Sequence, residues 1–384
     1  MQPGTSMPET KRTATGRFLL APLLGMLPLL LLGITLSLFH YQQLNRLMHA
    51  DGNAIFQRIV QQVTRELENV YHPPMQALNL LALSKLVNTD SLSQRMDYLP
   101  MLAQVLTDNP QLNSVYAGWH DGDYLMLRPL GSRINQQRFS APQRARWMAW
   151  HIDIDEEDNR HNSYLFLDEN LKIVEARLAA DEGYDPRQRP WYAAASKADQ
   201  RMITTPYLFF STREFGTTLA RASGSIAVFG ADLTLDRLSE TLRQQRMTPS
   251  SELVLYTSDG VVVAYQDPHR LQHTTQGSSY LEPRHFNELG STLLATLALD
   301  GYTRERQTIK TLEGQRWVIQ QQRIDIMGTP DVYLAVLVPE TELLSEAYRL
   351  RTLGFWLSLG ISALLLPLSW VLWRVLLDPR NRDR

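Results

Sequence analysis

The sequence contains no cysteine among its 384 residues. This absence excludes disulfide bridges, zinc ribbons, iron–sulfur clusters and thiol nucleophiles together. An excess of positive charge is also lacking, because 38 Lys and Arg stand against 40 Asp and Glu, for a formal net charge of -2. Without a basic field to attract phosphates, we expect no nucleic-acid partner.

Signatures of catalysis and metal binding are missing as well. The chain has no G-x-S-x-G elbow, no G-x-x-x-x-G-K-[ST] phosphate loop and no H-E-x-x-H motif. The acidic run at 153–158 lacks the glycine and distal glutamate of an EF-hand loop, and His269 and His273 follow Pro268 in a predicted loop. We therefore predict a protein that is not an enzyme and has no catalytic residue, metal site or cofactor.

Two long hydrophobic runs are present instead. Phe18 to Phe39 and Leu353 to Trp373 carry no charge, and each is long enough to cross the ~30 Å hydrocarbon core of a bilayer. The first run exceeds the ~7–15 residue apolar region of a cleaved signal peptide, and no small-x-small cleavage site follows it. We therefore predict two transmembrane helices rather than a signal peptide and one anchor.

Basic residues on the flanks of these runs predict the topology. Lys11, Arg12 and Arg17 precede the first run, and four arginines follow the second at 374–384. The positive-inside rule then places both termini in the cytoplasm and the region between the runs outside it. The predicted organisation is a cytoplasmic tail at 1–17, a span at 18–39, an extracytoplasmic region at 40–352, a span at 353–373 and a second tail at 374–384.

The extracytoplasmic region exceeds the ~100–150 residues of a typical domain, which favours two modules. It opens with an apolar stripe, Ile55, Ile59, Val63, Leu67 and Val70, which predicts a long amphipathic helix. The stripe fits packing on its own domain slightly better than a parallel dimer seam. The segment His72-Pro73-Pro74 is expected to interrupt or kink this helix.

Farther along, helical patterns alternate with short strand patterns separated by turn residues. Helices are predicted at 92–106, 233–243, 286–297 and 339–351. Strands are predicted at 114–119, 124–127, 164–167, 173–176, 225–230, 253–256, 261–265, 316–324 and 332–338. The strand and helix pattern occurs twice in outline, which predicts two tandem α+β modules.

The segment Tyr184-Asp185-Pro186-Arg187-Gln188-Arg189-Pro190-Trp191-Tyr192 is the most specific motif. An arginine two residues before a Trp-Tyr pair can present a guanidinium fork and an indole or phenolic donor to one carboxylate. Packing is the alternative interpretation, in which Pro and Trp support a wall and Asp–Arg pairs lock a loop.

This segment, together with Thr205-Pro206-Tyr207 and the run 230–235, resembles the double Cache (dCache) family of extracytoplasmic sensor domains. The resemblance covers about residues 40 to 352. It implies a long N-terminal helix that carries two PAS-like α+β modules, a membrane-distal one at about 90–245 and a proximal one at about 250–338. In this family, small molecules usually bind the distal module.

A subset of the family recognises amino acids, and the match to this subset is partial. It implies that Tyr184, Arg189, Trp191, Tyr192 and Asp232 contact the ligand, with Asp232 at the ligand's amino group. The first of the two expected aspartates is replaced by Phe209. The resemblance therefore implies a carboxylate-bearing ligand more firmly than an α-amino acid, and whether Glu214 compensates stays open.

The function expected from these features is that of a two-pass receptor in the bacterial inner membrane. Its periplasmic domain would bind a small carboxylate or amino acid, and it would signal as a homodimer or through a partner membrane protein, without an output domain of its own. The alternatives are a membrane-anchored structural or assembly protein, and a truncated histidine kinase, diguanylate cyclase or chemoreceptor.

Overall fold

The chain divides into two compact units, of which one comprises Phe56–Glu340 and the other comprises Met1–Ile55 with Thr341–Arg384. The computed structural model describes residues 56–155, 157, 159–180, 182–198, 201–246, 248–271, 282–303, 305–325, 331–343 and scattered positions within 31–39 and 345–371. Most of both predicted membrane segments, 18–39 and 353–373, lies outside the described residues. No helix among the described residues has the length and apolar character needed to span a bilayer.

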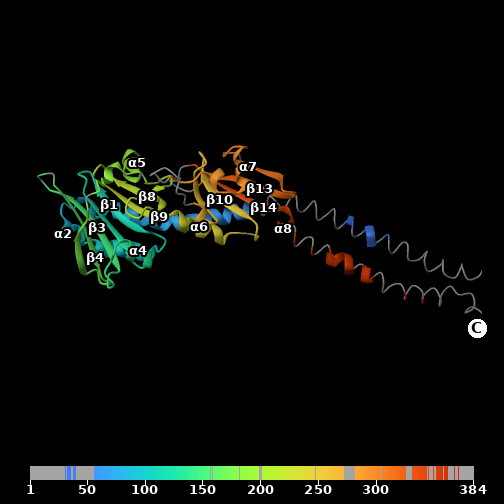
Figure 1. Ribbon diagram of the computed structural model, residues 1–384, viewed down its shortest axis with the longest axis horizontal. Coiled ribbons are helices and arrows are strands. Elements are labelled where there is room, and N and C mark those ends of the chain that lie inside the picture. Colours follow the sequence, from blue (N-terminus) through green and yellow to red (C-terminus); the bar gives the residue numbers. More distant parts are fainter. Residues whose placement is uncertain are drawn as a thin grey trace, which may run out of the picture. The chain divides into compact units, whose positions relative to one another are not determined.

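The unit from Phe56 to Glu340 contains two antiparallel sheets (Figure 1). The first sheet has nine strands in the order β5-β4-β3-β2-β1-β9-β8-β6, and β7 pairs with β8. Its strands are β1 (Ser114–Trp119), β2 (Tyr124–Pro129), β3 (Trp147–Ile154), β4 (Arg160–Leu167), β5 (Ile173–Leu178), β6 (Arg201–Ile203), β7 (Tyr207–Leu208), β8 (Phe215–Ser223) and β9 (Ala227–Thr234). These antiparallel strands and their helices confirm the predicted α+β class.

Strand β1 lies in the middle of the first sheet, and all six of its residues are buried. Its two neighbours come from different parts of the chain, since Tyr116 pairs with Met126 of β2 on one side and with Gly230 of β9 on the other. Side chains alternate between the two faces of a strand. Ser114, Tyr116 and Gly118 therefore share the face that carries the candidate site.

The opposite face of the first sheet is covered by helices. These are α2 (Leu92–Met96) and α3 (Leu99–Asp108), preceded by the 3₁₀ turn η1 (Lys85–Asn88). The prediction of one helix over 92–106 was wrong, because α2 ends at Met96 and α3 starts at Leu99. Pro100, which lacks a backbone N–H, lies in the first turn of α3, where no donor is needed.

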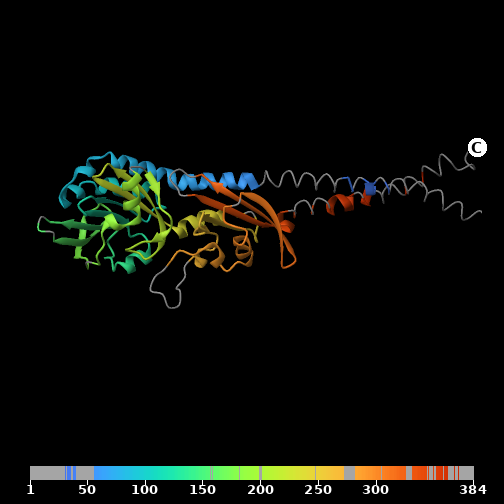
Figure 2. The same ribbon diagram turned by 90° about the horizontal axis from the view of Figure 1, so that it is seen from above.

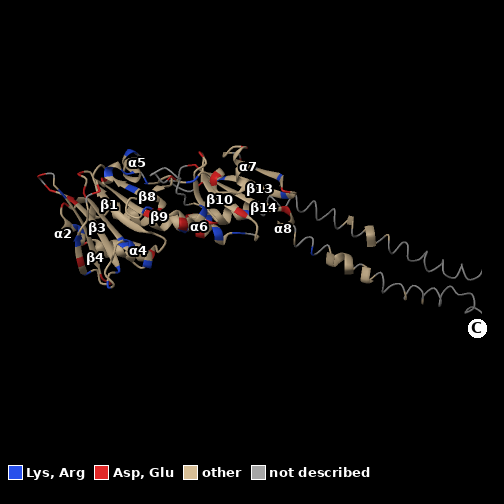
Figure 3. Cartoon of the chain, viewed as in Figure 1, with Lys and Arg blue, Asp and Glu red and all other residues tan. Residues whose placement is uncertain are grey.

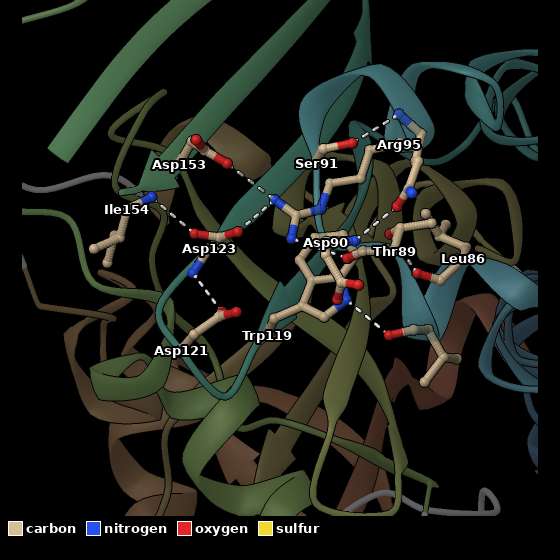
Figure 4. A network of polar contacts seen from close by, with 12 residues as sticks. Leu86, Thr89, Asp90, Ser91, Arg95, Trp119, Asp121, Asp123, Asp153 and Ile154 are labelled. Atoms are coloured by element: carbon tan, nitrogen blue, oxygen red, sulfur yellow. Dashed lines mark hydrogen bonds and ion pairs between the residues drawn. The ribbon is translucent and has the colours of Figure 1, made fainter. Parts of the chain in front are cut away.

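A buried ion pair joins α2 to the β1–β2 hairpin (Figure 4). Arg95 of α2 is 0% exposed, and its Nη1 lies 2.6 Å from Oδ2 of Asp123 and 3.6 Å from Oδ1 of Asp153. Its guanidinium carbon lies 4.1 Å from the centre of the Trp119 ring, and its Nη2 donates to the carbonyl of Thr89. The arginine therefore holds the turn of the hairpin against the helical layer.

A long helix over residues 56–82 extends along both sheets (Figure 2). Near its start, Gln57 Nε2 donates to Gln322 of the second sheet, and at its end the carbonyl of Ala82 accepts a hydrogen bond from Ser223 of the first. The stripe residues Ile59, Val63 and Leu67 are at most 7% exposed. Packing of the stripe on its own domain is thereby confirmed for these residues.

Of the two outcomes expected at His72-Pro73-Pro74, an interruption does not occur, because the helix continues through both prolines as far as Ala82 without a break. A proline leaves the carbonyl four residues earlier without its helical donor. For Pro74 that carbonyl belongs to Val70, and it accepts a hydrogen bond from Gln111 Nε2 at 3.3 Å. A side chain from outside the helix thus replaces one missing backbone donor.

The second sheet has five strands in the order β11-β10-β14-β13-β12. These are β10 (Glu252–Thr257), β11 (Val262–Tyr265), β12 (Arg306–Leu312), β13 (Gln315–Ile324) and β14 (Val332–Pro339). Four match predicted strands, and β12 was not predicted. The helix expected over 286–297 is divided into the turn η4 (Phe286–Glu288) and α7 (Thr292–Ala298), because Gly290 between them has a φ of +72°.

Helix α6 (Leu235–Gln244) follows β9 and contacts strands of both sheets. It matches the helix predicted at 233–243, and its apolar face, Leu235, Leu238 and Leu242, is buried. On the same helix, Ser239 Oγ accepts a hydrogen bond from the backbone N–H of Tyr265 in β11. The remaining short elements are α4 (Arg133–Arg138), η2 (Pro186–Gln188), α5 (Pro190–Ala198), η3 (Pro268–Arg270) and α8 (Glu340–Leu343).

Candidate ligand-binding site

A small cavity of about 20 Å³ lies on the face of the first sheet that the helical layer leaves free. Its wall is largely aromatic and includes two charged side chains. The residues that line it are Tyr116, Tyr124, Met126, Trp150, Tyr184, Arg189, Trp191, Tyr207, Phe209, Phe210, Ser211 and Asp232. Its volume is about that needed by one water molecule, below the ~300–1,000 Å³ of a usual ligand pocket, but the composition of its wall, aromatic with a few convergent polar groups, is that of a small-molecule site.

The sheet side of the wall is built by side chains that alternate along β1 and β2. Tyr116 lies over Gly230, its partner on β9, where an added Cβ would come within 2.1 Å of the tyrosine ring. Only a glycine lets the ring lie this close to the neighbouring strand. The phenol of Tyr116 can therefore reach Asp232, two residues along β9 on the same face.

Asp232 is buried among hydroxyl groups. Its Oδ1 accepts hydrogen bonds from Tyr116 at 2.5 Å and Thr218 at 2.7 Å, and its Oδ2 accepts one from Ser114 at 2.9 Å. Burial raises the pKa of Asp232, and these hydrogen bonds together with the charge of Arg128 oppose the rise. A carboxylate offers about four lone-pair positions, so Oδ2 keeps one for a further donor.

A fourth hydroxyl extends this network. The hydroxyl oxygens of Tyr207 and Thr218 lie 2.6 Å apart and are hydrogen-bonded. Since Thr218 gives its proton to Asp232, Tyr207 is the donor in the second bond. The network thus directs its donors toward the carboxylate.

The loop side of the wall is held by η2 and α5. Asp185 caps η2 by accepting from the backbone N–H of Arg187, and the two side chains form an ion pair at 3.0 Å. Arg187 also donates to the carbonyls of His120 and Asp121, which ties the loop to the β1–β2 turn. This Asp–Arg lock agrees with the structural role considered for part of the motif.

Trp191 on α5 faces the sheet. An added Cβ on Gly118 of β1 would lie 2.9 Å from Pro186 and 3.0 Å from the Trp191 ring, so the absence of a side chain there admits both. Trp191 is 1% exposed, and its ring packs edge-on against that of Tyr116, with 4.9 Å between the ring centres. Trp191 therefore belongs to the core and to the cavity wall at once.

Arg189 reaches the cavity from the loop. Its Nη2 donates to the carbonyl of Leu208 at 3.1 Å, and its guanidinium carbon lies 5.6–5.9 Å from the ring centres of Tyr184, Tyr207 and Phe210. A guanidinium has five N–H donors. The aromatic rings thus fix the position of a cation that keeps donors for an anion.

Four of the five residues predicted to contact a ligand, Tyr184, Arg189, Trp191 and Asp232, line this one cavity. Tyr192 is 9% exposed but does not line it. Neighbouring residues on a helix point about 100° apart, so α5 cannot direct Trp191 and Tyr192 to the same place. The pKa of Tyr192 is raised by burial and is affected by Arg187, Asp121 and Asp185, which belong to the loop lock.

The two residues that bear on the missing aspartate have different positions. Phe209 is 2% exposed and lines the cavity, so an apolar ring takes the place expected for a carboxylate. Glu214 is not part of the wall; its Oε1 pairs with Arg138 at 3.1 Å and its Oε2 accepts from Asn113. Within this structure, Asp232 is the acidic residue of the cavity wall.

Much of the aromatic wall was not predicted from the sequence. Tyr116, Tyr124, Trp150, Tyr207 and Phe210 were not predicted as site residues, although all line the cavity. The available signal was the period-two spacing of Tyr124 and Met126 on β2 and the position of Tyr116 on β1. Using that signal required knowing which face of the sheet meets the loop.

Metal binding has no support from the part of the chain described here. Among these residues, no three His, Asp or Glu side chains gather in a way that could hold an ion. Asp155 of the acidic run bonds instead to His161 and Asn159. His273 lies outside the described residues. Basic and acidic residues are interspersed over the described elements (Figure 3).

Several known proteins are similar in sequence to this chain. No family model matches the chain. The chemotaxis protein PctB of Pseudomonas aeruginosa is 25% identical over 293 residues, which cover 74% of this chain and 41% of PctB. Adenylate cyclase 1 of Rhizobium meliloti is 27% identical over 173 residues, covering 44% of this chain and 26% of the cyclase. The chain thus matches less than half the length of these relatives.

Solved structures with a similar fold are ligand-binding domains of chemoreceptors. That of Pseudomonas fluorescens CtaA with L-leucine has a TM-score of 0.49 and 15% identity, covering 77% of this chain and 97% of that one. That of PctB with L-Arg has a TM-score of 0.47 and 17% identity, with the same coverage of both chains. The resemblance to the dCache family is confirmed. Similarity to methyl-accepting chemotaxis proteins also supports the prediction of a sensor that is not an enzyme.

Proposed function

We propose that the chain is the sensor part of a membrane receptor and that the cavity of the first sheet binds an amino acid. The observation that carries this proposal is the convergence of Arg189, Trp191, Tyr184 and Asp232 on one cavity. A cation on the loop side and a carboxylate on the sheet side match the two charges of an amino acid.

Arg189 and its neighbours would bind the ligand's carboxylate. The guanidinium is positioned by three aromatic rings and by the Leu208 carbonyl, so little side-chain entropy is lost on binding. Burial raises the pKa of Tyr184, while hydrogen bonds to Tyr124 and Trp191 oppose the rise. Tyr184 therefore stays protonated and can donate.

Asp232 would bind the ligand's ammonium group. Its Oδ2 accepts only from Ser114 among the hydrogen bonds described above, which leaves an acceptor position on the cavity side. Phe209 replaces the first of the two aspartates expected for amino-acid recognition, so Asp232 would hold the ammonium with the phenol oxygens of the wall. Such a site binds the amino group less strongly than one with two carboxylates.

For the whole chain we propose the organisation given by the sequence. Residues 18–39 and 353–373 would cross the inner membrane, the domain at 40–352 would be periplasmic, and the distal module would be the one at about 90–245, ahead of the proximal module at about 250–338. Signalling would pass through a homodimer or a partner membrane protein. Binding would act by shifting the population between two arrangements of the domain.

The test is thermal unfolding of the purified full chain in detergent with a panel of amino acids. A ligand at about 100 times its dissociation constant stabilises the folded state by about 2.7 kcal/mol, which raises the unfolding midpoint measurably. We expect Arg189→Ala to abolish the shift. Tyr192→Phe is the matched control, since it removes one hydroxyl of the same motif outside the cavity wall and should retain the shift. A shift that persists in Arg189→Ala would contradict this site.

A further inference from the structure

Arg128 on β2 is a buried cation that the site described so far does not use. It is 0% exposed, and none of its three guanidinium nitrogens has a hydrogen-bond partner among the described residues. Its guanidinium carbon lies 5.3 Å from the centre of the Phe139 ring. A buried guanidinium without an acceptor costs free energy, so its retention calls for an explanation.

The strand register places Arg128 beside the cavity. On β2 it follows Tyr124 and Met126 at intervals of two, so its side chain lies on the same face as these two wall residues. The pairing of Val115 with Leu127 puts Ser114 next to Arg128, and Ser114 in turn pairs with Asp232. Arg128 and Asp232 therefore share one row of the sheet, two strands or about 10 Å apart at their backbones.

Electrostatics connect Arg128 to the wall. Burial raises the pKa of Asp232 and of Tyr124, and the positive charge of Arg128 opposes both rises. Glu214 and Arg138 also act on Arg128, but they pair with each other at 3.1 Å. The pairing of Glu214 with Arg138 leaves the Arg128 charge uncompensated by a direct contact.

The charged groups at the cavity are thus Arg189 and Asp232 in its wall, and Arg128 beside the wall on the same face of the sheet. An amino acid with a neutral side chain supplies one carboxylate and one ammonium, which pair with Arg189 and Asp232 and leave Arg128 alone. An amino acid with an acidic side chain supplies a second carboxylate. With that ligand each of the three protein charges gains an opposite partner.

We propose that Arg128 is a specificity-determining residue that binds the side-chain carboxylate of an acidic amino acid. This inference rests on the proposed function, since it assigns the ligand class of the same cavity. Arg128 disfavours ligands with a cationic side chain by repulsion between like charges. Dicarboxylates without an amino group bind more weakly, because Asp232 then lacks its ammonium partner.

The experiment is calorimetric titration of the full chain in detergent with L-aspartate, L-glutamate and their amides, L-asparagine and L-glutamine. The wild type is expected to bind the acids at least about tenfold more tightly than the amides, since a charged hydrogen bond replaces a neutral one. Arg128→Met keeps the volume and removes the charge. It should abolish this preference, because the affinity for the acids falls more than the affinity for the amides. Arg128→Lys should retain part of the preference.

The results distinguish this inference from the proposed function. Equal affinity of the wild type for acids and amides, with binding lost in Arg189→Ala, would overturn the role of Arg128 and leave the amino-acid site intact. An acid preference that survives in Arg128→Met would overturn it as well. Should none of the four ligands bind the wild type, the inference fails, and the wider panel tested with Arg189→Ala decides separately whether the cavity binds any amino acid. If Arg128→Met does not fold, the wild-type comparison and Arg128→Lys still decide the matter.

Discussion

Arg95 and Arg128 are both fully buried, on opposite faces of the first sheet, and their surroundings differ. Arg95 lies on the helical side of the sheet, where Asp123 is 2.6 Å away and the Trp119 ring lies beneath the guanidinium. Arg128 lies on the opposite, cavity side, and no nitrogen of its guanidinium has a hydrogen-bond partner among the described residues. The two arginines are therefore equally buried, but only Arg95 has a carboxylate in direct contact.

The difference separates a group that stabilises the fold from one that serves recognition. A paired buried cation leaves an uncompensated partner when it is removed, so its loss destabilises the protein. An unpaired buried cation already costs free energy in the folded state, and its removal relieves that cost. Measurements of stability and of binding on the same two positions therefore give opposite patterns.

The largest expected effect is that of Arg95→Met. It leaves the Asp123 carboxylate buried without its ion pair, and we expect the free energy of unfolding to fall by about 3–5 kcal/mol. Chemical unfolding of the full chain measures this change. Arg128→Met is the matched control, in which the free energy of unfolding should stay the same or rise. Equal losses in the two variants would remove the distinction between the sites.

The next effect concerns pH on the Arg95 side of the sheet. His151 of β3 is 2% exposed, and burial, with a further contribution from the charge of Arg95, lowers its pKa from 6.5 to about 4. Above pH 6.5 the ring is neutral in both the folded and unfolded states. As the pH falls from 6.5 to 4, only the unfolded state gains the proton, so stability falls by about 3 kcal/mol in total.

A difference measurement isolates this contribution. Burial raises the pKa of Asp123 and Asp232, and their protonation on acidification acts in the opposite direction. Unfolding of the wild type and of His151→Leu is therefore followed from pH 7 to pH 4, and the wild type should lose more stability over that range. Parallel curves for the two proteins would show that His151 titrates alike in both states.

The smallest effect is expected for Glu214→Gln. Its ion pair with Arg138 is about one-third exposed on both sides, and such pairs contribute about 0.5 kcal/mol or less. The affinity for an amino acid should change by less than about threefold, because Glu214 lies outside the cavity wall. Titration and unfolding of the variant measure both quantities. A large loss of affinity would mean that Glu214 replaces the aspartate missing at Phe209.

Local sequence patterns predicted the elements that depend on local chemistry. Strands β1 and β2 were predicted at 114–119 and 124–127, and α6 was predicted as a helix at 233–243. Strands β3 and β8 were not predicted. Most of their residues are buried on both faces, so their sequences lack the alternation that identifies a half-buried strand.

The site was predictable only where one continuous segment carries it. Arg189 and Trp191 lie in a motif that is specific by itself, whereas Tyr116 reaches Asp232 across 116 positions of sequence. The pairing of β1 with β9 creates this contact, and no local pattern encodes the pairing. Arg128 was missed for the same reason, since nothing in its neighbourhood along the chain distinguishes it from a surface arginine.

The two prolines in the helix over 56–82 make one of its turns easier to bend than the others. Pro73 and Pro74 remove two backbone hydrogen bonds of the helix. These two residues lie between Gln57, which contacts the second sheet, and Ala82, which contacts the first. Gln111 replaces one of the missing hydrogen bonds by donating from its side chain to the carbonyl of Val70. An amide side chain from outside the helix therefore contributes to the stiffness of the connection between the two sheets.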